Sequence, residues 1–374
     1  MDRLVLAQGA SFDLEDTDLK AEALSRGMGY DRCCYRRNDD GSTIYSAWGR
    51  NGCRISLFRT LFTNVCYHQC GYCQNAGRAS NGCSYTPEEL SDLVLRLRRE
   101  GRIDGLFLSS GAGRDEDSTM EGMIETVRIL RVRHGFPGYI HLKILPGTSR
   151  ALIEEAVELS DRVSINIEAP SGDVMEDLSP TKDYERDILD RQRWIRDLLA
   201  RRSSGSQTTQ LVVGAAGETD LEIFEGVVRE YREIGVSRVY YSAFVPIKGT
   251  IFEGRMQQPR WRESRLYQLD WLYRVYGLSP DEIKNAFDDD GFLPNEDPKV
   301  TLARESLDWP VDVNEADLQS LIRVPGIGPE SARRIISYRR IKKVERPSDL
   351  IRLGIKRKAI PYLRINGWVQ RRLF

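Results

Sequence analysis

The sequence predicts an α/β protein, a (β/α)6 partial TIM-type barrel followed by a small all-α domain. Short apolar runs alternate with longer amphipathic stretches through most of the chain, which is typical of βα units around a parallel sheet. The last sixty or so residues are different, because they are strongly basic and have helical periodicity. A turn-rich, acidic stretch at 288–299 lies before this second region and resembles a linker.

The barrel prediction rests on six expected strands and five helical segments between them. The strands are expected at 55–62, 105–111, 139–145, 163–169, 209–215 and 238–244. The helices are expected at 87–100, 119–134, 149–160, 183–202 and 219–234. In α/β barrels the catalytic groups lie at the carboxyl ends of the strands, so we expect the site there.

Length and composition indicate a globular protein with more than one domain. The chain has 374 residues, of which 40% are hydrophobic and 30% charged. No run of ~18 apolar residues predicts a membrane span, and the first residues lack the features of a secretory signal. We therefore expect a cytoplasmic protein that does not associate with membranes.

Charge is unevenly distributed along the chain. Residues 311–374 contain 15 Lys and Arg against 6 Asp and Glu, a net +9, whereas the whole chain has a net charge of −1. We expect an N-terminal extension at 1–50, the barrel at 51–260, a helical connector at 261–310 and a separate basic domain at 311–374. The connector includes a helix near 261–278 whose apolar side chains recur at helical spacing.

Polar residues are expected inside the barrel. In the strand near 163–168, a period of two places Ser164, Asn166 and Glu168 on one face and Val163, Ile165 and Ile167 on the other. His141 and Lys143 share a face of another strand, and Ser109, Ser110 and Gly111 end a third. A polar ligand would explain this interior, while the alternative is a hydrogen-bonded polar core.

Cys66, Cys70 and Cys73 are the strongest chemical signal. Seven cysteines in a chain without a disulfide pattern indicate reduced thiols. The C-x3-C-x2-C spacing supplies three thiolates to one small cluster and leaves a fourth position open, whereas electron-transfer [4Fe–4S] centres use four. A zinc site completed by His68 is an alternative, although His68 lies inside the loop. The remaining Cys33, Cys34, Cys53 and Cys83 could bind a second cluster or be structural thiols.

The basic C-terminal region contains a predicted helix, tight turn and second helix. Asn314 is expected to cap the first helix, and the turn is PGIG at 325–328. Free amides at the start of the second helix favour an anion such as phosphate. This region is similar to helix-hairpin-helix domains, which bind the nucleic-acid backbone, and the expected contact residues are Gly326, Ile327, Gly328, Arg333, Arg334, Arg339, Arg340 and Lys342. Gly354 marks a degenerate second hairpin, and a protein-interaction module is the alternative.

The cysteine pattern resembles the radical S-adenosylmethionine (SAM) superfamily. That resemblance implies a [4Fe–4S] cluster on Cys66, Cys70 and Cys73, with SAM on the fourth iron and a 5′-deoxyadenosyl radical that abstracts hydrogen. It assigns cofactor contacts to Tyr72, Ser109, Ser110, Gly111, Ser164, Asn166 and Glu168. The sequence reads SSGAG where the superfamily often has a Gly-Gly-Glu-like turn. An electron donor such as flavodoxin or ferredoxin is implied as well.

Passages spread over the whole chain resemble a bacterial family of radical SAM proteins described as acting in DNA modification or repair. They include LFRTLFTNVC at 57–66, GYIHLKILPG at 138–147, VSINIEAPS at 163–171 and VDVNEADLQSLIRVPGIG at 311–328. The resemblance implies DNA as the substrate and a uracil-DNA glycosylase-like protein as a partner. RNA modification and a non-enzymatic iron–sulfur nucleic-acid-binding protein are the alternatives. Lys143, Tyr240 and Tyr241 are candidate catalytic residues because they lie near strand ends.

Overall fold

The computed structural model describes residues 17–26, 28, 43–48, 53–78, 82–305 and 309–370. These residues form two compact units. The first contains the described residues up to Glu218 together with Glu225–Gln258, and the second contains Thr219–Phe224 and Pro259 onward. Helix α7 therefore begins in one unit and continues in the other.

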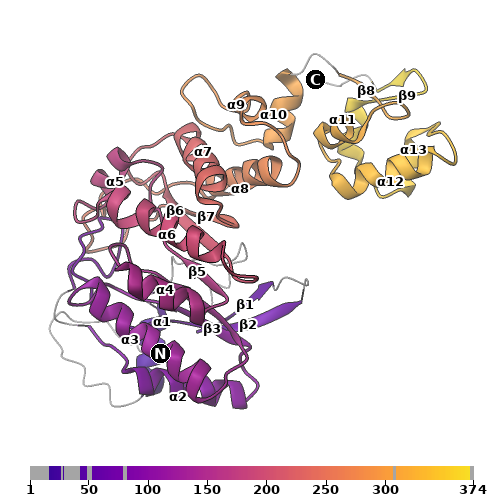
Figure 1. Ribbon diagram of the computed structural model, residues 1–374. Coiled ribbons are helices and arrows are strands. Elements are labelled where there is room, and N and C mark those ends of the chain that lie inside the picture. The colour runs from indigo at the N-terminus through magenta and orange to yellow at the C-terminus, as the bar shows by residue number, and fades with distance from the viewer. Residues whose placement is uncertain are drawn as a thin grey trace, which may run out of the picture. The chain divides into compact units, whose positions relative to one another are not determined.

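A curved seven-stranded sheet organises the first unit (Figure 1). Its strands follow one another in chain order: β1 (Ile44–Trp48), β2 (Arg54–Leu61), β3 (Gly105–Ser109), β4 (Tyr139–Lys143), β5 (Arg162–Ser164), β6 (Gln207–Val213) and β7 (Arg238–Ala243). Strands β2 to β7 are parallel, as the βα alternation predicts, and β1 pairs antiparallel with β2. The predicted fold class, a partial α/β barrel, is confirmed. Strand β1 is an addition, because 1–50 had no predicted strand.

Helices cover the sheet on its outer face. They are α1 (Thr17–Arg26), α2 (Pro87–Arg99), α3 (Glu116–Arg128), α4 (Arg150–Leu159), α5 (Gly172–Leu178), α6 (Asp190–Leu199) and α7 (Asp220–Arg229). Helices α2, α3, α4 and α6 contact one another in this order (Figure 1). Single π-helical turns extend α3 (η1, Ile129–Arg133) and α7 (η3, Glu230–Ile234), and another precedes α6 (η2, Tyr184–Leu189). The short helix α5 was not predicted.

Helix α2 shows how the sequence sets the helix boundaries. The Thr86 side chain accepts a hydrogen bond from the Glu89 amide, and the Glu89 carboxylate accepts one from the Thr86 amide. This capping box satisfies two amides that the first helical turn leaves without partners. Leu90, Val94 and Leu97 then recur on the buried face.

Strand β5 is shorter than expected. The alternation from Val163 predicts a strand to 169, but regular pairing ends at Ser164. Beyond it, Glu168 adopts a left-handed conformation with φ of 57° and forms an isolated parallel bridge to Leu211. The chain thus leaves the sheet before Glu168 and returns to it for one residue.

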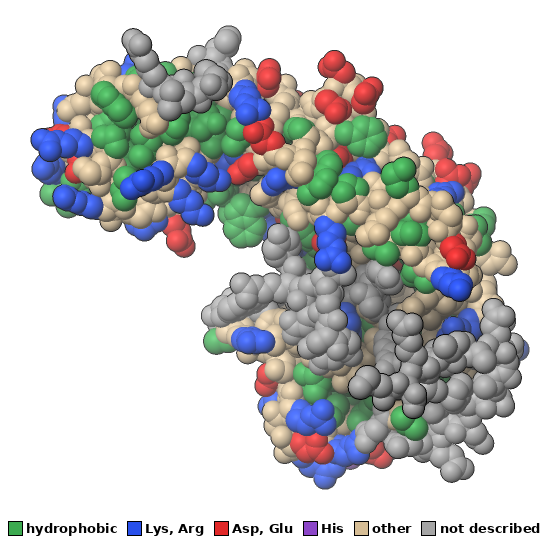
Figure 2. Space-filling view, turned by 180° about the vertical axis from the view of Figure 1, so that it is seen from behind, with side chains coloured by type: hydrophobic (Ala, Val, Ile, Leu, Met, Phe, Trp, Pro, Cys, Tyr) green, Lys and Arg blue, Asp and Glu red, His purple; other side chains and the backbone are tan. Residues whose placement is uncertain are grey.

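The second unit is helical with a small sheet. Its helices are α8 (Arg260–Arg274), α9 (Pro280–Lys284), α10 (Pro298–Glu305), α11 (Leu318–Arg323), α12 (Pro329–Arg339), α13 (Pro347–Arg352) and the 3-10 helix η4 (Arg357–Tyr362). Strands β8 (Val311–Asp312), β9 (Leu363–Ile365) and β10 (Trp368–Val369) form a three-stranded sheet, which a purely helical prediction did not include. Figure 2 shows Lys and Arg side chains spread over the face of this unit that it presents.

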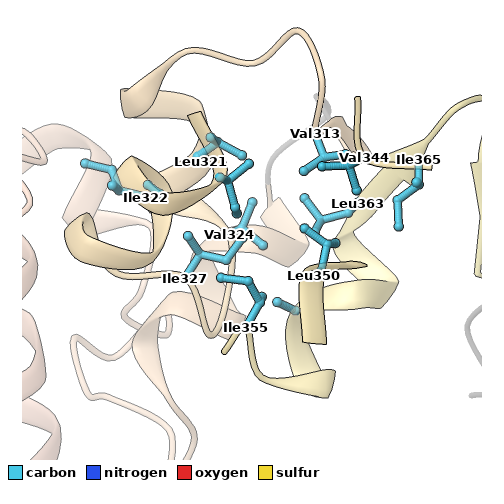
Figure 3. Packing of buried hydrophobic residues seen from close by; sticks show 13 residues of the cluster. Val313, Leu321, Ile322, Val324, Ile327, Val344, Leu350, Ile355, Leu363 and Ile365 are labelled. Carbon is cyan, nitrogen blue, oxygen red and sulfur yellow. The ribbon is translucent and has the colours of Figure 1, made fainter. Parts of the chain in front are cut away.

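A cluster of aliphatic side chains holds the C-terminal helices together (Figure 3). Leu321, Val324, Ile327, Ile335 and Leu350 are essentially inaccessible to solvent. They come from α11, the following turn, α12 and α13, so each short helix is stabilised by packing rather than by its own length.

The cap of the first hairpin helix differs from the prediction. Asp317 caps α11 by accepting a hydrogen bond from the Ser320 amide at 2.7 Å. Asn314 lies earlier and exchanges two side-chain hydrogen bonds with the backbone of Val344, each 2.9 Å long. Asn314 therefore joins two segments instead of starting a helix.

No helix in the described part of the chain is long and apolar enough to cross a membrane.

A buried carboxyl group lies between two outer helices of the first unit. Glu230 is 2% exposed and accepts a hydrogen bond from the Gln192 amide at 2.9 Å. Burial raises the pKa of Glu230 to about 8, because the charged form loses its hydration. In an unfolded chain the same group has an ordinary pKa near 4.5.

We therefore predict that the free energy of unfolding contains a pH-dependent contribution from Glu230. Between about pH 4.5 and 8 the folded protein keeps a proton that the unfolded chain releases, so stability falls as pH rises, by at most about 1.4 kcal/mol per pH unit. Glu230→Gln should reduce this slope and be more stable than the wild type at pH 8. Urea unfolding at several pH values measures it, with the exposed Glu154→Gln as control. An unchanged slope in Glu230→Gln would contradict the prediction.

Candidate active site

A pocket opens at the carboxyl ends of the parallel strands. Its walls come from the ends of β2, β3, β4, β6 and β7, from the loop after β2 and from the segments after β5. The polar and sulfur-containing side chains that line it are Cys66, His68, Cys70, Tyr72, Cys73, Gln74, Asn75, Ser109, Ser110, Lys143, Asn166, Glu168, Lys182, Gln210 and Ser242. The predicted position of the site therefore agrees with the location of this pocket.

The cysteine loop, residues 63–78, is held by backbone hydrogen bonds to several segments. The amides of Tyr67 and Gly71 donate to the carbonyls of Ala112 and Leu178, at 3.0 and 2.8 Å. Within the loop, the Cys73 amide donates to the Cys70 carbonyl at 3.0 Å. Cys66 and Cys70 are 8% and 6% exposed, and all three thiols line the same pocket.

Gly111 permits the closest approach to the cysteine loop. Its amide donates to the Thr63 carbonyl at 2.8 Å. A Cβ atom at Gly111 would lie 2.3 Å from the Val65 carbonyl oxygen and 3.0 Å from the Cys66 Cβ. Only glycine fits this contact, so the residue after the β3 strand end positions Cys66.

A second close contact involves the segment after β7. A Cβ atom at Gly71 would lie 2.4 Å from the Phe252 ring, and the Phe252 amide donates to the Gly71 carbonyl at 3.0 Å. The Arg255 guanidinium stacks on the same ring at 3.4 Å from its centroid. The middle of the cysteine loop is thus packed between α5 and the segment that leaves the barrel.

Burial opposes ionisation of these thiols. It raises the pKa of Cys66, although the backbone amides of Ala112 and His68 act in the opposite direction. Burial, and then the charge of Cys70, raise the pKa of Cys73 to about 12. Thiolates at these positions need a positive partner, and a metal cluster is one that supplies it.

Lys182 brings a cation to the same wall. Burial favours its neutral form, but the charges of Cys70, Glu168 and Cys66 outweigh this and raise the pKa of Lys182. Tyr72 lies close to Glu168, and burial followed by the Glu168 charge raises the pKa of its phenol, which stays protonated. The pocket therefore combines two lysine side chains, Lys143 and Lys182, with the Glu168 side chain and three thiols.

Asn166 and Glu168 present polar groups that fit a hydroxyl-bearing ligand. Asn166 lines the pocket, and its buried Oδ1 has no hydrogen-bond partner among the described residues. Two backbone hydrogen bonds hold Glu168 in its left-handed conformation. Its amide donates to the Gln210 carbonyl at 3.0 Å, and its carbonyl accepts from the Val212 amide at 2.9 Å. Such strain persists at sites where a side chain must take a particular direction.

Several sequence-predicted residues come together in the pocket, and others do not. Tyr72, Ser109, Ser110, Gly111, Lys143, Asn166 and Glu168 line it with the three cysteines. Ser164 lies outside the lining, where its hydroxyl is 2.8 Å from His141 Nε2. Tyr240 and Tyr241 are buried and are also outside the lining. Burial, then the charges of Arg162 and Lys143, lower the pKa of His141 well below its usual value, so it stays neutral.

Sequence reasoning missed Lys182, Gln210 and Ser242. Gln210 and Ser242 have a usable signal, because they lie on predicted strands at alternate positions that face inward. Lys182 has none, since it lies in an irregular connection between α5 and η2. Its position depends on how that connection folds over the cysteine loop.

His68 has partners of its own. Its Nδ1 is 3.1 Å from the Thr181 hydroxyl, and its Nε2 is 3.3 Å from Glu116 Oε1. Burial alone would raise the pKa of Glu116, but hydrogen bonds from His68 and Tyr67 lower it to about 2. In the part of the chain that the structure covers, no three His, Cys, Asp or Glu side chains are arranged to hold a single metal ion.

The four remaining cysteines do not gather at the pocket as far as they are described. Cys53 is exposed and Cys83 is half-buried, and neither lines the pocket. Cys33 and Cys34 lie outside the described residues.

The predicted hairpin is present in the second unit. Helices α11 and α12 flank the PGIG turn, where Gly326 has a φ of 87° and Gly328 is the N-cap of α12. The Ile327 amide donates within the turn to the Val324 carbonyl at 3.0 Å, and its side chain is 1% exposed. Ile327 therefore belongs to the core, while the two glycines are partly exposed.

The connector packs against this turn. Lys299 of α10 donates to the Ile327 carbonyl at 2.5 Å, and its Nζ lies 4.6 Å from the centroid of the Tyr276 ring. A Cβ atom at Gly328 would lie 3.1 Å from the Tyr276 hydroxyl. The second unit, from residue 259 onward, therefore contains both the hairpin and the connector residues that pack against its turn.

The predicted basic contacts lie in the middle of α12 and at its end. Arg333 and Arg334 are exposed in the middle of the helix. Arg339 is at its end and donates to the Val313 carbonyl at 2.9 Å, and Arg340 and Lys342 follow it. Because a helix rises about 1.5 Å per residue, the second group lies roughly 10 Å along the axis from the first and does not surround the turn.

Comparison with known proteins identifies two regions. A model of the radical SAM superfamily matches residues 60–229, and a model of the helix-hairpin-helix motif matches residues 309–360. The first match covers strands β3 to β6 and the cysteine loop, and the second covers α11, α12 and α13. No curated protein matches the chain.

Several solved structures are similar to part of this chain. Methylornithine synthase (PylB) is 17% identical, with 54% of this chain and 57% of that chain covered and a TM-score of 0.45. A radical SAM methyltransferase from Sphaerobacter thermophilus is 18% identical, with 57% of this chain and 67% of that chain covered and a TM-score of 0.41. The FeFe-hydrogenase maturase HydG from Carboxydothermus hydrogenoformans is 15% identical, with 54% of this chain and 47% of that chain covered and a TM-score of 0.44. The chain spans about half the length of the first structures that it matches.

We predict that Gly111→Ala displaces Cys66 and lowers the iron content of the reconstituted protein several-fold. The added methyl group would overlap the Val65 carbonyl, which is backbone and cannot rotate away. Iron and sulfide analysis, with visible absorbance, measures the loss. Gly254→Ala is the control, because no atom lies within 4 Å of its Cβ position. Equal iron content in the two variants would contradict the prediction.

Proposed function

We propose that this chain is a radical SAM enzyme that acts on a nucleic acid, because the radical SAM superfamily model matches residues 60–229 and the helix-hairpin-helix model matches residues 309–360. The observation that carries the proposal is the presence of both regions on one chain. One region has a thiol-lined pocket for the chemistry, and the other is of a kind that holds phosphate backbones. We propose DNA modification or repair as the process and RNA as the alternative polymer.

Radical SAM proteins carry a [4Fe–4S] cluster and use SAM, and the pocket suits both. We propose that Cys66, Cys70 and Cys73 hold the cluster, since they are three free thiols on one pocket wall. Together the two cofactors supply a hydrogen-abstracting radical when bound. The surrounding residues bind and orient the reactants and exclude water.

The chain's own side chains suggest how SAM is held. We propose that Asn166 and Glu168 bind the ribose hydroxyls, because a buried amide oxygen without a partner and a carboxylate both accept hydrogen bonds. Ser109, Ser110 and Gly111 are proposed to lie along the methionyl part, close to Cys66. Tyr72 supports Glu168, and Lys143 is proposed to face the substrate from β4.

The helix-hairpin-helix motif supports the proposal that the substrate is a nucleic acid. Gly326, Gly328, Arg333 and Arg334 are proposed to contact phosphate at the start of α12, where the helix dipole favours an anion. Arg339, Arg340 and Lys342 are proposed as a separate basic group at its other end. A target base inside a duplex would have to be flipped out or already unpaired to reach a barrel pocket.

Other parts of the proposal concern the cellular setting. A one-electron donor of the flavodoxin or ferredoxin type is needed to reduce the cluster. A uracil-DNA glycosylase-like protein is a proposed partner in repair. Free thiols at the pocket favour a reducing compartment such as the cytoplasm.

We predict that nucleic acid stimulates SAM cleavage by the reduced, full-length protein. Formation of 5′-deoxyadenosine should rise several-fold with the correct polymer, because substrate binding completes the closed site. Single-stranded and duplex DNA and RNA of one sequence should be compared, with heparin as a polyanion control. Stimulation by RNA alone would favour the alternative polymer, and stimulation by none of the four would argue against a nucleic-acid substrate.

We predict that Arg333→Glu/Arg334→Glu weakens nucleic-acid binding at least tenfold and flattens its salt dependence. Each lost phosphate contact reduces the number of counterions released on binding. Fluorescence anisotropy at several salt concentrations measures both quantities. The matched control is Arg201→Glu/Arg232→Glu, an equal charge change at exposed positions of the first unit.

Point substitutions are preferable to removing residues 311–374. Deletion would uncover Lys299 and Tyr276, which pack on the hairpin turn, and would damage the connector. Equal salt slopes for the hairpin variant and its control would overturn the assignment of phosphate contacts to α12.

A further inference from the structure

The segment between α5 and η2, residues 178–182, wraps around the middle of the cysteine loop. The Leu178 carbonyl accepts from the Gly71 amide at 2.8 Å. The Thr181 hydroxyl lies 3.2 Å from the Gln69 amide and 3.1 Å from His68 Nδ1. We call residues 178–182 the loop clamp.

One clamp residue reaches Cys70 itself, and a second lies in the same pocket. The Ser179 Oγ lies 3.2 Å from the Cys70 Sγ. A thiolate that binds iron can only accept a hydrogen bond, so the serine hydroxyl is the donor in that state. Lys182 lines the pocket together with the three cysteines, and the charge of Cys70 raises the pKa of its ammonium.

The thiols therefore have different surroundings. The Cys73 Sγ accepts from the Asn75 amide at 3.5 Å, and a backbone donor of this kind is unaffected by most substitutions. The Cys70 Sγ lies beside the Ser179 hydroxyl, a side-chain donor that a single substitution removes. The Lys182 charge acts to lower the pKa of the Cys66 and Cys73 thiols as well, and it too can be removed by one substitution.

We propose that Ser179 and Lys182 are positioning residues that set the reduction potential of the cluster through Cys70. Reduction adds one negative charge to the cluster, and a nearby ammonium and hydroxyl donor stabilise that charge more than they stabilise the oxidised state. Hydrogen bonds to sulfur and local charge are among the levers by which proteins tune iron–sulfur potentials. These two side chains raise the potential and make the cluster easier to reduce. The inference rests on the proposed ligation by Cys66, Cys70 and Cys73.

Thr181 helps to separate an electrostatic role from a structural one. Its hydroxyl holds the same loop through Gln69 and His68 and also lies 3.5 Å from Ser179 Oγ. Thr181→Val should therefore loosen the loop while Ser179 and Lys182 stay in place. We expect its main effect on the iron content, and a smaller effect on the potential than that of Ser179→Ala.

The test is a redox titration of the reconstituted full-length protein, with the reduced cluster followed by electron paramagnetic resonance. Ser179→Ala and Lys182→Met should shift the midpoint potential to more negative values, and Lys182→Arg should restore most of it. Thr181→Val should shift the potential of its remaining cluster less than Ser179→Ala does. Ser171→Ala and Lys248→Met are the controls, because Ser171 makes no side-chain cap bond and Lys248 is exposed.

Separate outcomes bear on the two proposals. A wild-type protein that assembles no cluster counts against the ligand assignment. With the cluster present, unchanged potentials in Ser179→Ala and Lys182→Met overturn the inference about the clamp. Equilibrium dialysis of SAM gives a second readout. A weaker affinity in Lys182→Met with an unshifted potential would show that Lys182 binds the cofactor instead, and would also overturn it.

Discussion

The parallel pairing of strands β2 to β7 is the constraint on which the pocket depends. Parallel strands in adjacent βα units end at the same edge of a sheet, so the residues that follow each strand are brought together. The cysteine loop follows β2, Gly111 lies beyond the end of β3, and Glu168 returns to the edge of β6. These groups are separated by about a hundred residues and share one pocket because of this pairing.

Close backbone contacts turn this shared edge into a defined site. Gly111 and Gly71 allow neighbouring segments to approach the cysteine loop at distances that a side chain would prevent. Backbone hydrogen bonds to other segments hold the loop, and its three thiols line one pocket.

Charge balance in the pocket is local. Burial disfavours thiolates, and the charges of Cys70 and Glu168 raise the pKa of the Lys182 ammonium in the same pocket. Glu116, which is held ionised by Tyr67 and His68, adds a negative charge beside His68, a residue of the pocket lining. The second unit shows a related device, since Lys299 satisfies the carbonyl of Ile327 at the hairpin turn. In both places a lysine from a connecting segment supports the residues that the motif supplies.

The sequence by itself determined the fold class, the pocket's position at the strand ends, and most of the polar residues around it. Alternation of βα units, the cysteine spacing and the PGIG turn are local patterns, and local patterns are set by residues close in the chain. Three features were decided only by tertiary structure. The left-handed backbone of Glu168 depends on its bridge to Leu211. The placement of Lys182 depends on how an irregular connection folds. The burial of Ile327 depends on contacts with α10 and α13. Tyr240 and Tyr241 illustrate the same limit, because their strand was predicted but the depth of each residue below the pocket was not. Each of these features arises from contacts between residues far apart in the sequence, which periodicity and spacing do not encode.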